Sequence, residues 1–275
     1  MRLDKVSERV YANTEGQSGG NVGIVVFPRR VVAVDSMFPV PGEDFRRSIP
    51  GITKRHVSHL LLTHVHSDHV FGNQAFEDVD IVGHIRLREK MEESLKTAWT
   101  PKGIDKMIED LKKSNPDRVP MLKGLRIVLP KTTFERSYRV SDVRIVNTGG
   151  HTDCSSYVYV PGDKVLFAGD NLFVGRYPWA GDPTADPDRW IKALEAYLKL
   201  DVKVIVPGHG PLCDKAEVEK QLKWFRSMRR MMKRLISEGV PEDEAVRARY
   251  PEIYPSDRPE WVQNSLRVWF RHWKA

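Results

Sequence analysis

The stretch LTHVHSDHV at residues 62–70 places three histidines and an aspartate within six positions, directly after the apolar run VSHLLLT at 57–63. In an extended chain the side chains at i and i+2 point the same way, so His64 and His66 can face one metal ion. Asp68 and His69 follow as the chain turns, and can face a second ion. A histidine-rich surface turn is the alternative, but the strand followed by H-x-H-x-D-H favours a metal site.

Three further candidate ligands follow apolar runs that are typical of strands. They are His151 in TGGHT, Asp170 in FAGDN and His209 in VPGHG. The neighbouring glycines allow tight turns and leave room for an ion. Imidazole and carboxylate groups suit Zn²⁺, and also Fe or Mn. We therefore expect all of these side chains to meet at one metal centre.

The apolar and polar patterns predict an α/β chain, with two sheets sandwiched by helices. Strands are expected at 21–27, 31–36, 57–63, 80–83, 125–129, 142–147, 155–160, 164–169 and 202–206. Helices are expected at 68–76, with Ser67 or Asp68 as the N-cap, twice within 85–114, at 187–199 and at 216–237.

Composition narrows the function classes. The chain has 275 residues and a formal net charge of +7, which is modest for a nucleic-acid-binding protein but compatible with small anionic substrates. Its two cysteines, Cys154 and Cys213, are too few for a disulfide framework. No secretory signal or apolar run long enough for a membrane helix is visible. We expect a cytoplasmic protein that contacts neither membranes nor nucleic acid.

The motifs THVHSDHVFGN, NTGGHTDCSS, LFAGDN and IVPGHGP resemble those of the metallo-β-lactamase fold superfamily, in its hydrolase branch related to glyoxalase II. The resemblance covers roughly residues 5 to 215. It implies a four-layer αβ/βα sandwich with the metals at one edge of the two sheets. We expect a domain at 1–215 with a helical insertion at about 85–123, and a C-terminal helical extension at 216–275 packed on the same domain.

The resemblance also implies a full set of ligands for two divalent ions, Zn²⁺ first and Fe or Mn as alternatives. The first ion would take His64, His66 and His151, and the second would take Asp68, His69 and His209. Asp170 would bridge both, Asp68 and Asp170 would be the catalytic residues, and Asp35 resembles an aspartate that orients one of the histidines. Such partners fix the tautomer and angle of a ligating ring.

Two adjacent cations would yield a bridging hydroxide as the nucleophile. The expected reaction is cleavage of a small ester, thioester or lactone. Class B β-lactamases lack the bridging aspartate that stands here as Asp170, and flavin-coupled relatives carry glutamate in place of His66. Two alternatives stay open: a sulfur dioxygenase-like oxidoreductase with one iron, and a nuclease or phosphodiesterase of the tRNA-processing type, although the Gly/Pro-rich arm of those nucleases is not seen.

Aromatic residues supply the candidate walls of a substrate pocket. Phe173, Tyr177 and Trp179 follow the third motif, and core packing is an equal alternative for each. The simplest roles for Cys154 and Cys213 are those of a small buried residue and a loop residue. Aromatic residues of the tail, at helical spacing, are expected to dock either on the core or on a second copy of the chain, which would make a homodimer.

Overall fold

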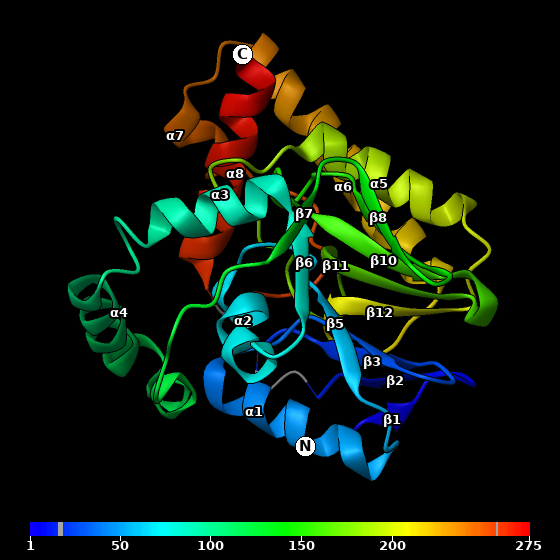
Figure 1. Ribbon diagram of the computed structural model, residues 1–275. Coiled ribbons are helices and arrows are strands. Elements are labelled where there is room, and N and C mark those ends of the chain that lie inside the picture. The colour runs from blue at the N-terminus through cyan, green and yellow to red at the C-terminus, as the bar shows by residue number, and fades with distance from the viewer. Residues whose placement is uncertain (16–18, 257) are drawn as a thin grey trace.

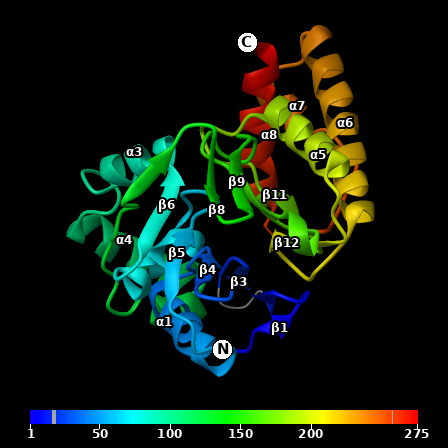
Figure 2. The ribbon, with the colours of Figure 1, turned by 45° about the vertical axis from the view of Figure 1, so that its right-hand side comes forward.

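The computed structural model describes residues 1–15, 19–256 and 258–275. Within them, two mixed sheets face each other (Figures 1 and 2). The seven-stranded sheet has the order β1 (Asp4–Lys5), β2 (Val10–Asn13), β3 (Val22–Val26), β4 (Val31–Val34), β5 (Val57–Leu61), β6 (Asp80–His84) and β7 (Thr132–Phe134). The five-stranded sheet has the order β12 (Val204–His209), β11 (Val165–Phe173), β10 (Ser156–Val160), β9 (Val143–Asn147) and β8 (Ser137–Val140).

Helices cover the outer faces of both sheets. The α-helices are α1 (Pro39–Ser48), α2 (Ser67–Val70), α3 (Ile85–Ser94), α4 (Pro101–Ser114), α5 (Pro187–Lys199), α6 (Lys215–Ser237), α7 (Glu242–Ala245) and α8 (Pro259–Lys274). Short 3-10 helices span Ile49–Gly51, Phe71–Phe76, Pro116–Leu122 and Pro161–Asp163. This arrangement confirms the predicted αβ/βα sandwich with C-terminal helices.

Three apolar clusters hold the layers together. The central one lies between the sheets and includes Val25, Leu61, Val82 and Val158. A second cluster joins the seven-stranded sheet to α1 and the segments around it. The third joins the five-stranded sheet to α5, α6 and α8, which both views show side by side over that sheet (Figures 1 and 2). The central cluster is rich in valine, and burial of these β-branched side chains drives the packing of the two sheets on each other.

The tail aromatics pack mainly on their own chain. Trp269 and Phe270 of α8 are buried in the third cluster, where the Trp269 ring meets Phe225 of α6 at 5.2 Å between centroids. Of the two docking modes expected for the tail, the structure shows packing on the core, and a homodimer remains an untested prediction. No helix in the described ranges combines the length and apolar content needed to cross a bilayer.

Three secondary-structure expectations are wrong in detail. Residues 125–129 form no strand, whereas β7 and β8 lie where none was expected. The segment predicted as one helix at 68–76 is the single turn α2 followed by a 3-10 helix. Its N-cap is His66, not Ser67 or Asp68, and the His66 side chain makes no capping hydrogen bond.

Candidate metal centre

Carboxyl-terminal ends of parallel strands meet at one edge of the molecule. Strands β4, β5 and β6 run parallel, as do β11 and β12. Asp35 follows β4, the LTHVHSDH segment follows β5, and His209 ends β12. In open α/β sheets this edge is the usual place for a ligand site, because the loops leaving the strands converge there.

Seven side chains predicted to bind metal lie in two adjacent groups. One group is His64, His66, His151 and Asp170, and the other is Asp68, His69 and His209. Within each group the possible ligand atoms all lie within 4.8 Å of one another. The chain therefore brings together every residue that the sequence motifs singled out as a ligand.

The Asp170 carboxylate lies between the two groups. Its Oδ2 is 3.6 Å from His64 Nε2, 3.5 Å from His151 Nε2 and 3.3 Å from His209 Nε2. Its Oδ1 is 3.2 Å from His69 Nε2. One carboxylate thus faces histidines of both groups, which is the placement expected of a bridging ligand.

Buried polar atoms at the centre test whether the donor set fits metal ions. His64 Nε2, His69 Nε2 and Asp170 Oδ1 are buried without a hydrogen-bond partner in the structure. Leaving such atoms unpaired costs about 1–3 kcal/mol each. Bound cations would satisfy all three atoms, and imidazole with carboxylate is a suitable donor set for Zn²⁺, Fe or Mn. The residues present therefore fit divalent metal ions.

Protonation states also suit metal binding. Burial lowers the pKa of His64 well below its ordinary value and lowers the pKa of His151 to about 3, so both rings are neutral at pH 7. Burial alone would raise the pKa of Asp170, but the neighbouring histidines, His209 and His69 first, hold it well below its usual range. Burial alone would lower the pKa of His69, but Asp170 and Asp35 raise it well above its ordinary value. His69 therefore carries a proton that a bound cation would displace, since metal binding releases protons from its ligands.

The ring nitrogens that face away from the centre have partners of their own. His69 Nδ1 donates to Asp35 Oδ2 at 2.9 Å, and Asp35 is the position where the resemblance implies an aspartate that orients one of the histidines. Asp35 also accepts from the backbone N–H and the hydroxyl of Thr63, each at 2.7 Å. His151 Nδ1 donates to the Trp179 carbonyl at 2.9 Å. These bonds fix the ring tautomers and leave Nε2 of each ring toward the centre.

Asp182 contacts a candidate ligand but was not singled out by the sequence motifs. Its Oδ2 accepts from His66 Nε2 at 3.2 Å, which leaves His66 Nδ1 beside His151 Nε2 at 2.8 Å. Lys90 of α3 reaches the same loop, with Nζ 2.6 Å from the Thr184 hydroxyl and 3.6 Å from Asp182 Oδ1. The only signal was an aspartate in a glycine- and proline-rich loop, and nothing in the sequence links that loop to His66.

Two glycines keep the centre open. A Cβ at Gly20 would collide with the His69 ring, and a Cβ at Gly208 would collide with Asp170 Oδ1. Both backbones therefore approach the candidate ligands more closely than any other residue would allow. Gly208 belongs to the VPGHG motif, whose glycines were expected to make this room.

The three predicted pocket aromatics lie in different environments. The Phe173 ring stacks on His209 at 5.4 Å and an interplanar angle of 17°, and is itself buried. The Trp179 ring lies 5.3 Å from His66. Tyr177 packs into the third core cluster, edge-on to Trp224 at 5.6 Å. Trp179 is thus the one of the three that lies beside a partly exposed candidate ligand.

The cysteines are not part of either group of possible ligands. Cys154 is buried, and burial raises the pKa of its thiol to about 11. Cys213 pairs through its backbone with Ile205, and burial raises the pKa of its thiol to about 12. Both thiols are therefore protonated at neutral pH and unreactive.

A four-layer αβ/βα sandwich with such a histidine and aspartate cluster at its sheet edge defines a class of metal-binding α/β proteins. Residues 16–209 match the family model described as "Metallo-beta-lactamase superfamily". The chain belongs to the metallo-β-lactamase superfamily, as the sequence motifs predicted. Membership supports a hydrolase.

Known proteins agree with this assignment. The "Metallo-beta-lactamase domain-containing protein 1" of Xenopus laevis is 28% identical over 204 residues, which are 71% of this chain and 72% of that protein. The "Beta-lactamase-like protein 2 homolog" of Caenorhabditis elegans is 24% identical over 177 residues, 63% of this chain and 49% of that protein. Among solved structures, a metallo-beta-lactamase from Pontibacter korlensis superposes with a TM-score of 0.60 at 22% identity, covering 82% of this chain and 98% of that one, which shows a shared fold.

Proposed function

We propose that the protein is a metal-dependent hydrolase that cleaves a small ester, thioester or lactone with two divalent ions, Zn²⁺ most simply. The observation that carries the proposal is the Asp170 carboxylate, whose two oxygens face histidines of both groups at 3.2–3.6 Å. Such a pair of ions supplies an activated water and an electrophile for the carbonyl oxygen.

Within this proposal the chain's own residues orient the reactants and move protons. Asp68 and Asp170 are the acid–base residues: they take the proton that the attacking water loses and return it to the leaving oxygen or sulfur. The bond formed joins the water oxygen to the carbonyl carbon, and the carbon–oxygen or carbon–sulfur bond breaks. Asp35 and Asp182 hold the rings of His69 and His66 in place.

The substrate would enter where the candidate ligands reach solvent. The side chains of His66 and Asp68 are 21% and 16% exposed, whereas those of His64 and His69 are 1% and 0%. Trp179 lies against His66, and Trp261 of α8 lies 5.9 Å from Trp179. This pair of indoles offers an apolar wall for the acyl part or the leaving group of the substrate.

A cationic side chain flanks the same centre. Arg176 is exposed, and its Nη1 lies 3.4 Å from His209 Nδ1. An exposed guanidinium beside the ligands favours substrates that carry a negative charge, such as a carboxylate near the scissile bond. The formal net charge of +7 acts in the same direction.

The alternatives are less well supported. A mononuclear iron oxidoreductase needs one group of ligands, and this chain has a second group in Asp68, His69 and His209. A nuclease or phosphodiesterase would use the same metal chemistry. The observation that favours an ester, thioester or lactone over a phosphodiester is the apolar Trp179–Trp261 wall, which suits an acyl group better than a phosphate backbone.

A substrate panel tests the proposal. Metal-loaded protein would be assayed with aryl esters, acyl thioesters, lactones, a bis-aryl phosphodiester, a cephalosporin and a precursor tRNA. The expected result is the highest kcat/KM for a carboxyl ester or thioester. Greater efficiency with the phosphodiester or tRNA would refute the substrate class, and oxygen-dependent sulfur oxidation alone would refute hydrolysis.

Elemental analysis of the purified protein tests the number of ions and should find two metal ions per chain.

The remaining proposals concern the domain boundaries, the cellular location and the size of the substrate. We propose that residues 1–215 form the catalytic domain, with an insertion at 85–123, and that residues 216–275 are an extension on the same domain. Contacts of α6 and α8 with the third core cluster support this division. We also propose a cytoplasmic location and a small-molecule substrate.

A further inference from the structure

A basic hollow lies on the five-stranded sheet, apart from the candidate metal ligands. It is lined by Glu135, Arg136, Ser137, Tyr138, Arg139, Arg144, Val146, Asn147 and Arg189, and its volume is about 660 Å³. These residues come from β8, β9, the segment before β8 and the first turn of α5. A volume of this size is in the range of small-molecule sites, roughly 300–1,000 Å³.

Four arginines share this hollow with a single carboxylate, Glu135. In the described part of the chain their guanidinium contacts are with neutral oxygens. Arg139 Nε donates to the Ser141 carbonyl at 2.7 Å, and Arg189 donates to the Thr148 carbonyl at 3.0 Å and to Asn147 Oδ1 at 3.2 Å. The excess positive charge is therefore not neutralised locally.

The arrangement carries an energetic cost within the sheet. Arg139 of β8 and Arg144 of β9 are directly opposed in the antiparallel register, on the same face. Like charges in this position destabilise a pair of strands. Charged residues on edge strands do prevent sheet-to-sheet aggregation, and this would explain Arg139 on the edge strand β8. It does not explain Arg144 on the second strand or Arg189 on α5.

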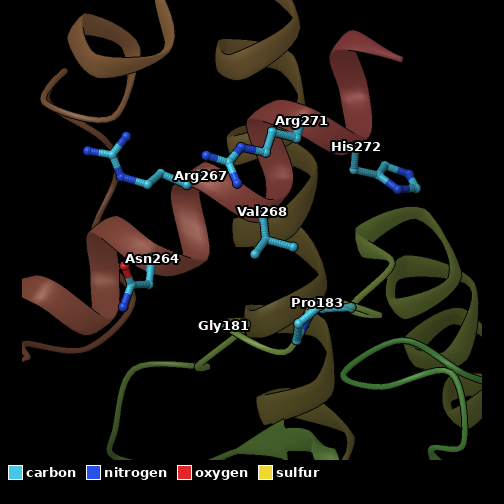
Figure 3. A pocket seen from close by; sticks show the side chains of 8 residues that line it. Gly181, Pro183, Asn264, Arg267, Val268, Arg271 and His272 are labelled. Atoms are coloured by element: carbon cyan, nitrogen blue, oxygen red, sulfur yellow. The ribbon is translucent and has the colours of Figure 1, made fainter.

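A second pocket provides a contrast. It has a volume of about 440 Å³ and lies between loop residues Gly181 and Pro183 and α8 residues that include Arg267 and Arg271 (Figure 3). Both of these arginines already pair with Glu242, at 3.3 and 2.8 Å. The arginines of that pocket are thus paired with a carboxylate, whereas the guanidinium contacts described for the basic hollow are with neutral oxygens.

We propose that the basic hollow binds a small organic polyphosphate, of the size and charge of a nucleoside diphosphate. Guanidinium groups bind phosphate oxygens in a bidentate manner. The four arginines and Glu135 together give the hollow a net charge of +3, which matches two phosphate groups. Val146, which opposes Ser137 on the same face as Arg139 and Arg144, adds apolar surface for the organic part. The site is separate from the proposed hydrolase reaction, and its ligand need not be a substrate.

Calorimetric titration of the metal-loaded full chain with ADP and with pyrophosphate tests the proposal. We expect saturable binding, weakened at least tenfold in the double variant Arg139→Gln/Arg144→Gln. That variant should also melt at a higher temperature, because the opposed charges are removed. The control, Lys223→Gln/Arg230→Gln on α6, removes the same charge from another surface and should bind like the wild type.

Three outcomes would overturn the proposal. One is the absence of saturable binding of either probe at millimolar concentration. Another is equal affinity in the double variant and the control: equal weakening would show non-specific charge attraction, and wild-type affinity in both would show binding elsewhere, such as at the metals. The third is that an RNA oligomer binds more tightly than ADP and is the probe that the double variant loses. None of these results depends on hydrolase activity, so they can be separated from failure of the proposed function.

Discussion

Asp35 and His69, thirty-four residues apart in the chain, are joined by a hydrogen bond of 2.9 Å between the buried carboxylate and the imidazole Nδ1. Asp35 adopts a positive φ of 56°, which an asparagine also tolerates. In Asp35→Asn the charge that favours the Nδ1-protonated ring disappears. We expect metal affinity to fall about 10- to 100-fold, as is usual when such a partner is lost.

Competition with a chromogenic chelator would measure this change. Asp44→Asn serves as the control, because the Asp44 side chain is 47% exposed and pairs with Arg47 on α1. Its affinity should equal that of the wild type. If Asp35→Asn also binds metal like the wild type, Asp35 does not position His69.

Asp170→Asn should preserve the fold and lower turnover by at least 100-fold. The amide carries no charge, so it balances two cations poorly and cannot return a proton to a leaving group. Metal content by elemental analysis and kcat on the best panel substrate are the two readouts. Wild-type values for both would show that Asp170 does not bridge the ions.

Ligand motifs could be predicted from the sequence because each places a histidine or aspartate at or near the end of an apolar stretch, although Asp170 lies inside β11, which continues past it to Phe173. The parallel pairs β4–β5 and β11–β12 then bring distant motifs to one edge. His151 reaches the same edge from the loop between the antiparallel strands β9 and β10. Asp182 escaped prediction because its contact with His66 depends on how the loop 179–186 folds back. No local pattern encodes that path.

The segment 125–129 shows why an apolar pattern alone did not fix a strand. Its side chains pack against the second core cluster, which explains their composition. Its backbone, however, bonds to side chains: the Val128 carbonyl accepts from Asn73 Nδ2 at 2.9 Å, and the Arg126 N–H donates to Gln74 Oε1 at 2.7 Å. With those groups satisfied, the segment needs no neighbouring strand.

Trp261→Ala should raise KM for the best substrate about tenfold and leave metal content unchanged. Trp261 is 39% exposed and extends the indole wall from Trp179, so truncation removes binding surface but no candidate ligand. Leu95→Ala is a matched control, since Leu95 is 38% exposed and lies after α3. If the two variants have the same KM and kcat, Trp261 does not contact the substrate.

A last prediction concerns Asp163, which links the two sheets. Its carboxylate accepts from the Ser7 hydroxyl at 2.7 Å and from Arg9 Nε at 2.7 Å, and its side chain is only 3% exposed. Burial alone would raise the pKa of Asp163, but these hydrogen bonds outweigh it and hold the pKa below 3.8. The ionised form is therefore favoured by folding, so its stabilising contribution is complete above the unfolded pKa and is lost as pH falls below it.

Asp163→Asn should accordingly lower the free energy of unfolding by about 2 kcal/mol at pH 6, the usual cost for hydrogen bonds to a charged group. The difference from wild type should shrink as pH falls below 3.8, where the unfolded carboxyl binds its proton. Urea unfolding at a series of pH values measures both. Asp142→Asn is the control, because Asp142 pairs with the same Arg9 but is 34% exposed, and it should cost less. A difference between wild type and Asp163→Asn that persists unchanged to pH 3 would show that the carboxylate charge is not what stabilises this link.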